Sequence, residues 1–112
     1  MANVYKNIQT TINQAASDVD MYTAPDETTS IIKSIKLYNT HGSNLVVDIK
    51  VYDLSSTTDF EWGTVTVLTN DSVDLLTFNN VLILEAGDIL RMQTPTTNVI
   101  KMTASVLQTS RS

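Results

Sequence analysis

The sequence contains no cysteine, and that absence excludes disulfide scaffolds, thiol nucleophiles and zinc knuckles together. Its three glycines are isolated from one another, so no glycine-rich loop is available to cradle a phosphate. No apolar run reaches the length of a membrane span, and the N-terminus lacks the basic start and apolar stretch of a signal peptide. We therefore expect a soluble protein made in the cytoplasm, with no cofactor and no contact with a membrane.

Charged residues are also scarce, at 17% of the chain, and acidic side chains outnumber basic ones by twelve to seven. Nucleic-acid binding usually needs a clustered basic face that releases counterions from the phosphate backbone. The basic side chains are instead scattered along the sequence: Lys6, Lys33, Lys36, Lys50, Arg91, Lys101 and Arg111. We therefore expect no direct binding of DNA or RNA.

Residues that could carry out catalysis are few. The single histidine, His41, lies in the polar run of residues 39–44, where a turn is expected. No Gly-x-Ser-x-Gly motif is present to hold a serine beside it, so a Ser-His-Asp triad is rejected. We predict no catalytic residue, and hence no enzyme.

Paired carboxylates are the remaining candidates for acid/base chemistry or for calcium. They occur at Asp18/Asp20, Asp26/Glu27, Asp59/Glu61 and Asp71/Asp74. None matches the Asp-x-Asp-x-Asp-Gly calcium loop. Each pair lies in or beside an expected turn, where aspartate accepts hydrogen bonds from local backbone amides, so we interpret them as solvated turn acids. A weak calcium site at Asp18 and Asp20 stays open, and no metal site is predicted.

The clearest pattern in the sequence is an alternation of apolar and polar residues from Ser30 to Asp53. Apolar residues occupy every second position on both sides of the polar run 39–44. A period of two is typical of half-buried β-strands, and a cluster of Asn, Gly and Ser is typical of a turn. The segment therefore predicts two strands that pair as an antiparallel hairpin.

Similar signals along the chain predict about eight strands, with turns at the short spacing of an all-β fold. We predict an antiparallel β-sandwich or a jelly-roll-like fold. At 112 residues the chain is long enough for one core, so residues 18–112 are expected to form a single domain after an N-terminal arm or first strand at residues 1–17. The run 81–84 is entirely apolar, which suits a strand covered on both faces. The predicted core is Ile35, Leu37, Val47, Ile49, Val51, Val65, Val67, Leu75, Ile83, Ile89, Ile100, Met102, Ala104 and Val106.

Aromatic residues supply the main candidates for a contact surface. Phe60 and Trp62 have the same parity, so either both pack inward or both are exposed for recognition. Tyr38 and Tyr52 share the polar parity of the predicted hairpin and should lie near each other on an outer face. The predicted protein–protein interface consists of Val4, Tyr5, Ile8, Tyr38, Tyr52, Phe60 and Trp62. Three further hydrophobic residues fall on outward positions and would be covered in a homo-oligomer: Leu68, Met92 and Leu107.

Three motifs resemble those of small virion structural proteins from tailed bacteriophages. Residues 21–25, Met-Tyr-Thr-Ala-Pro, are similar to their Tyr-Thr-Ala-Pro-like turn, and residues 32–39 follow the pattern Ile-x-x-Ile-x-Leu-x-Asn. Residues 84–90 are similar to their Leu-x-Ala-Gly-Asp turn, and a strand at residues 98–107 closes the domain as theirs does. The resemblance covers residues 19–107.

The resemblance implies a non-enzymatic virion component, above all a head decoration or cement protein that stabilises a capsid by bridging neighbouring subunits. Its partners would be the major capsid protein or other virion proteins, together with copies of itself, for which a trimer is favoured. A component of a tail, neck, baseplate or fibre is the nearest alternative. A carbohydrate-binding module is the alternative from another class, with Trp62, Phe60 or a tyrosine as the stacking platform.

Overall fold

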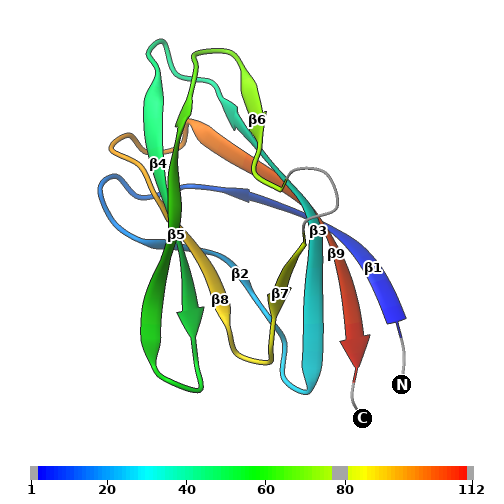
Figure 1. Ribbon diagram of the computed structural model, residues 1–112. Coiled ribbons are helices and arrows are strands. Elements are labelled where there is room, and N and C mark those ends of the chain that lie inside the picture. Colours follow the sequence, from blue (N-terminus) through cyan, green and yellow to red (C-terminus); the bar gives the residue numbers. More distant parts are fainter. Residues whose placement is uncertain (1–2, 77–80, 111–112) are drawn as a thin grey trace.

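The structure, a computed structural model, describes residues 3–76 and 81–110 as a β-sandwich of two antiparallel sheets (Figure 1). No helix within these residues is long and apolar enough to cross a membrane. The nine strands of the described residues are β1 (Asn3–Thr11), β2 (Val19–Thr23), β3 (Thr28–Asn39), β4 (Leu45–Asp53), β5 (Thr58–Val67), β6 (Ser72–Asp74), β7 (Leu82–Leu84), β8 (Ile89–Gln93) and β9 (Ile100–Ser110).

Within each sheet, strands from the first half of the chain lie next to strands from the second half. Sheet A has the order β1-β9-β3-β6, with β7 also paired to β3, and sheet B has the order β2-β8-β4-β5. β6 pairs with residues 36–38 of β3 and β7 with residues 30–32, so the two short strands share one edge of sheet A. Counted as one interrupted strand, they complete the strand order of a jelly roll. The predicted all-β sandwich is confirmed.

The first strand lies at the other edge of sheet A. β1 pairs with β9 along its whole length, from Asn3 opposite Thr109 to Thr11 opposite Lys101. The edges of sheet B are β2 and β5. These edge strands matter for function, because one side of an edge strand has backbone groups and side chains that no neighbouring strand of the sheet covers.

The predicted hairpin of residues 30–53 is wrong, although both of its strands exist. β3 belongs to sheet A and β4 to sheet B, so the polar run between them forms a corner that crosses from one sheet to the other. The buried side chain of Asn39 organises this corner. Its Nδ2 donates to the carbonyls of Ser43 and Val67, each over 2.9 Å, and its Oδ1 accepts from the amide of His41 over 2.7 Å.

The core lies between the two sheets and agrees in most positions with the alternation in the sequence. Nine predicted core residues are buried: Ile35, Leu37, Val47, Ile49, Val67, Ile100, Met102, Ala104 and Val106. Four others are only partly buried, namely Val51, Val65, Leu75 and Ile89. Ile83 was assigned wrongly, since its side chain is 56% exposed. The run 81–84 is not covered on both faces, because β7 is a short edge strand in which Leu84 alone is buried.

Candidate interaction surfaces

Four hydrophobic side chains line up across the outer face of sheet A, one each from β1, β9, β3 and β7. Tyr5 lies directly opposite Leu107, Leu107 opposite Ile31, and Ile31 opposite Ile83. Ile32, the next residue of β3, is fully buried, which places this set on the outer face. Residues opposite each other in antiparallel strands have Cβ atoms about 5 Å apart, so the four form a continuous strip, here called the apolar row. Its ends are open to solvent, with Tyr5 74% and Ile83 56% exposed.

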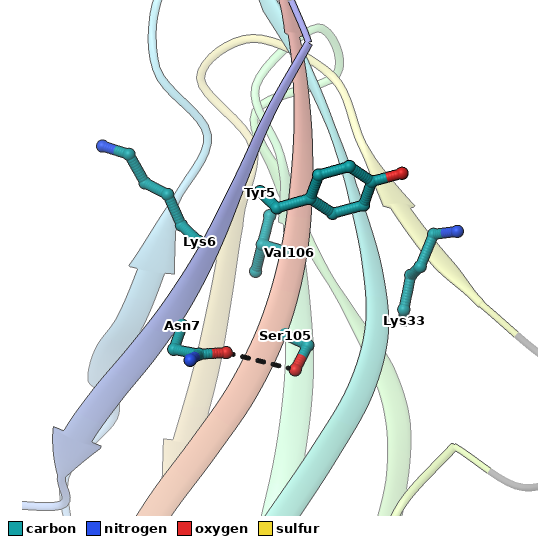
Figure 2. A pocket seen from close by; sticks show the side chains of 6 residues that line it. All are labelled: Tyr5, Lys6, Asn7, Lys33, Ser105 and Val106. Carbon is teal, nitrogen blue, oxygen red and sulfur yellow. Dashed lines mark hydrogen bonds between the residues drawn. The ribbon is translucent and has the colours of Figure 1, made fainter.

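A shallow recess of about 190 Å³ opens beside Tyr5 (Figure 2). The tyrosine ring extends across β9 toward the side on which Lys33 lies, whereas Lys6 points to the opposite side of β1. The hydroxyl of Ser105 donates to Oδ1 of Asn7 over 3.4 Å in the same recess. Pockets for small molecules usually measure about 300–1,000 Å³, so this recess suits a single side chain of a protein partner better.

The outer face of sheet A also gathers lysines that lie far apart in the sequence. A bulge in β3 shifts the pairing register at Lys33, and this side chain lines the recess beside Tyr5. Lys36 and Lys101 are exposed on the same face, each next to a buried residue of its own strand. Asp74, opposite Lys36, is the one acidic strand residue on this face within the described chain. Three lysines and one aspartate give the face a net charge of +2, although the cations look scattered in the sequence.

The outer face of sheet B carries a network of ion pairs centred on Arg91. Its Nε lies 2.8 Å from Asp20 Oδ1, and its Nη1 lies 3.0 Å from Asp59 Oδ1. The guanidinium also stacks over the ring of Tyr52, 4.6 Å from the ring centroid. The hydrogen bond to Asp20, with the charges of Asp20 and Asp59, raises the pKa of Arg91. Tyr52 is thus held beneath a cation of its own chain.

A second set of ion pairs surrounds Lys50 on the same face. Its Nζ lies 3.2 Å from Asp18 Oδ1 and 3.8 Å from Asp48 Oδ2. The hydrogen bond to Asp18 is the main cause of the raised pKa of Lys50. The two aspartates considered for calcium, Asp18 and Asp20, therefore each bind a basic side chain. Within residues 3–76 and 81–110, no group of three or more His, Cys, Asp or Glu side chains is placed to hold a metal ion.

Two carboxyl groups of sheet B lie against each other. The pKa of Glu61 is raised, chiefly by a hydrogen bond with Asp48, then by partial burial and by repulsion from that carboxylate. Two carboxyl groups can share a hydrogen bond only when one is protonated, and Asp48 Oδ1 is buried without a donor among the described residues. The interpretation of Asp59 and Glu61 as turn acids is wrong, since both lie within β5. With Asp18 and Asp20, this face has five acids against two cations, a net charge of -3.

The predicted interface residues are distributed over several surfaces. Tyr38 lies on the outer face of sheet A and Tyr52 on that of sheet B. The expectation that they are neighbours is wrong because it depended on the hairpin. On β1, Tyr5 points outward, while Val4 and Ile8 lie on the other side of the strand, Val4 44% exposed and Ile8 packed against the core. The role of these predicted residues in a protein–protein interface stays a prediction.

Phe60 and Trp62 do not pack inward, since they are 54% and 41% exposed. β5 is an edge strand, and its register shifts between Glu61 and Gly63, which leaves Trp62 as the extra residue of a β-bulge. Phe60 lies opposite Val51, yet the open edge leaves it uncovered. The parity argument for inward packing failed for Trp62 because the bulge interrupts the alternation there, and for Phe60 because the edge of the sheet leaves it open to solvent.

Of the three further hydrophobic residues that the sequence placed on outward positions, one belongs to the apolar row and one is wrong. The outward position of Leu107 is confirmed, and Leu68 is 51% exposed as predicted. Met92 is fully buried instead, because β8 is a central strand of sheet B and this residue lies opposite Ile49 of the core. Ile83 was missed, because an entirely apolar run does not reveal which of its residues point outward.

No known protein family and no curated protein matches the sequence. Solved structures that are similar to it include the following two. One is a chain from Bacillus endospore appendages, described as a novel family of disulfide-linked pili, with a TM-score of 0.61 and 15% identity over 98% of this chain and 89% of that chain. The other comes from a virus-like particle of Macrobrachium rosenbergii extra small virus, with a TM-score of 0.52 and 12% identity over 96% of this chain and 79% of that chain. At these identities the likeness concerns the fold.

Proposed function

We propose that this chain is a non-enzymatic structural protein that acts as a subunit of a larger assembly. The observation that carries the proposal is the apolar row, whose ends Tyr5 and Ile83 are exposed on sheet A. Monomeric proteins seldom leave a contiguous apolar strip open to water, and such strips commonly mark protein–protein contacts. Burial of the row against a partner would remove this apolar surface from water.

The structurally similar chains support the same class of function. One belongs to pili and the other to a virus-like particle, and both of these are assemblies of many subunits. The pili are described as disulfide-linked, whereas this sequence has no cysteine. Copies of this chain would therefore associate through non-covalent contacts.

Within this class we propose a head decoration protein of a bacteriophage that stabilises the capsid by bridging neighbouring capsid subunits. The resemblance of residues 21–25, 32–39 and 84–90 to phage virion proteins supports this assignment. A hydrogen-bonded sandwich is a rigid body that can present surfaces to several neighbours at once. Contacts that are weak singly would sum by avidity on a capsid lattice, most simply for a homotrimer.

The test is to measure the mass of the purified protein by light scattering, alone and after mixing with emptied phage heads. We expect an oligomer that saturates the heads in stoichiometric numbers and raises their melting temperature. The double change Tyr5→Ser and Ile83→Ser should weaken this binding. Leu54→Ser is the matched control, because Leu54 is 49% exposed but lies in the turn between β4 and β5. A monomer that does not bind heads contradicts the decoration role, and co-purification with tails at low copy number would instead support a tail component.

The exposure of Phe60 and Trp62 favours a carbohydrate-binding module as the second candidate, since exposed aromatic rings stack on sugars. In that case Trp62→Ala should abolish binding to a glycan array while the oligomeric mass stays unchanged. Tyr38→Ala, on the outer face of the other sheet, is the matched control. Absence of glycan binding by the wild-type protein would reject this function.

A further inference from the structure

The charges of the described strands are divided between the two sheets. The strands of sheet A contain Lys6, Lys33, Lys36 and Lys101 with Asp74, a net charge of +3. The strands of sheet B contain Asp20, Asp48, Asp53, Asp59 and Glu61 with Lys50 and Arg91, a net charge of -3. An acidic protein of net charge -5 therefore has one basic sheet and one acidic sheet.

This division also holds on the outer faces, which are the surfaces that a partner can reach. The outer face of sheet A has Lys33, Lys36 and Lys101, and we call it the lysine face. The outer face of sheet B has excess carboxylates, and we call it the acidic face. Both cations of the acidic face already bind carboxylates of their own chain, Arg91 at 2.8 Å and Lys50 at 3.2 Å, so the excess of acid is not neutralised within the monomer.

Charge determines which pairs of faces can meet. Two lysine faces would bring like charges together, and so would two acidic faces, which costs free energy at close range. A lysine face against an acidic face is the favourable combination. Each face also has apolar surface to bury: the apolar row on sheet A, and on sheet B the 52% exposed Val46 near the start of β4 and the partly buried pair Tyr52 and Ile89 near its end.

We propose that the partner of the lysine face is the acidic face of a second copy of this chain. The inference deepens the proposed function, because it names the partner and the surfaces of the assembly. The two faces lie on opposite sides of the sandwich, so each copy can bind one neighbour on each side (Figure 1). Such head-to-tail contacts close into a ring, for example a trimer, if the rotation between copies allows it, and otherwise extend into a filament.

Two variants test the proposal by sedimentation velocity. Variant A carries Lys36→Glu and Lys101→Glu, which makes the lysine face acidic. Variant B carries Glu61→Lys, Thr64→Lys and Thr66→Lys, which makes the acidic face basic; the two threonines are exposed and lie opposite the outward residues Asp48 and Val46. Each variant alone should associate at least about tenfold more weakly than the wild type, because its two faces now carry like charges.

The decisive measurement is the equimolar mixture of variants A and B. Opposite charges meet wherever a copy of variant A contacts a copy of variant B, so the mixture should form mixed complexes although neither variant assembles alone. These complexes should be dimers at least, and longer in a filament or an even-numbered ring, because two variants cannot alternate around a trimer. Wild-type assembly should also weaken between about 50 mM and about 500 mM salt, since exposed charges are screened over that range. Asp26→Lys with Glu27→Lys is the matched control: it changes the net charge by the same +4 as variant B, but in the exposed turn between β2 and β3, and should leave assembly unchanged.

The outcomes separate this inference from the proposed function. If the wild type assembles and variants A and B assemble equally well, the head-to-tail contact is overturned and the proposed structural role is left intact. Wild-type protein that stays monomeric at low salt also overturns it, and binding of single-stranded DNA to the lysine face would then assign that face to another partner. Charge-dependent assembly without binding to phage heads supports the contact and contradicts the decoration role. Circular dichroism of both variants checks that the β-sandwich is retained.

Discussion

The side-chain amide of Asn39 donates a 2.9 Å hydrogen bond to the carbonyl of Val67, and so joins the last residue of β3 to the last residue of β5. The first of these strands belongs to sheet A and the second to sheet B. The same buried amide binds both ends of the corner between β3 and β4, through Ser43 and His41. One side chain thus satisfies three backbone groups, two in the corner and one in β5, at the point where the chain changes sheets.

We expect Asn39→Ala to lower the free energy of unfolding by about 2–4 kcal/mol, since it removes three hydrogen bonds and leaves the buried Val67 carbonyl without that donor. Urea denaturation monitored by circular dichroism measures the change. Asn44→Ala is the control, because Asn44 is exposed and accepts a single hydrogen bond, from the amide of Thr69. Its cost should be about 1 kcal/mol or less. Equal effects of the two substitutions would contradict the role given to Asn39.

A second polar contact between the sheets joins Tyr22 of β2 to Ser30 of β3. Their hydroxyl groups lie 2.7 Å apart in the core, and Gln108 Nε2 donates to the tyrosine hydroxyl over 2.7 Å. We expect Tyr22→Phe to cost about 1–3 kcal/mol, because the fully buried Ser30 loses its hydrogen-bond partner. Adding Ser30→Ala should recover part of that loss in a double-mutant cycle. Strictly additive losses would mean that the two hydroxyl groups do not interact.

The turn before β8 depends on Gly87, whose φ is 87°. We expect Gly87→Ala to destabilise the protein by about 1–3 kcal/mol, since residues with a Cβ rarely adopt this conformation and the new methyl would crowd the side chain of Leu54. Thermal unfolding measures the loss. In Gly42→Ala the added Cβ meets no atom within 4 Å, so the change should stay within about 0.5 kcal/mol. A loss as large at Gly42 would show that the cost is general to glycine in this chain.

The sequence predicts the strands well because each strand is a local pattern. Ile35 and Leu37, or Ile100 and Met102, are recognised as core residues from their own neighbours alone. The sheet to which a strand belongs is a different matter, since it depends on contacts between distant segments. A polar turn such as residues 39–44 can reverse a strand within one sheet or lead it into the other, and the choice depends here on the bond from Asn39 to Val67, which lies 28 residues away along the chain.

The interaction surfaces were harder to predict for the same reason. The lysine face combines Lys33 and Lys36 of β3 with Lys101 of β9, and only the pairing of these strands brings them together. A parity argument also cannot reveal exposure at an edge. Phe60 lies opposite the partly buried Val51 but remains exposed, because no strand of the described residues pairs with the outer side of β5 in sheet B. The composition shows that charged residues are few, and the pairing of the strands determines on which face of the sandwich they gather.

The contact between Glu61 and Asp48 predicts a pH dependence with a definite sign. The pKa of Glu61 is raised on folding, chiefly by its hydrogen bond with Asp48, so the folded chain holds this proton more tightly than the unfolded chain. The free energy of unfolding therefore falls as the pH rises through the interval between the unfolded and the raised pKa of Glu61. Above that interval the two carboxylates repel each other.

We expect Glu61→Gln to be more stable than the wild type at pH 7, and this difference to vanish below about pH 4, where the unfolded side chain is also protonated. Thermal melts across this pH range measure it. Asp53→Asn should show the opposite sign, because the side chain of Ser55 donates to Asp53 and lowers its pKa. That stabilisation is present at pH 7 and is lost as the pH falls through the lowered pKa. A Glu61→Gln variant that is less stable than the wild type at pH 7 would contradict the carboxyl contact, because the amide cannot repel Asp48.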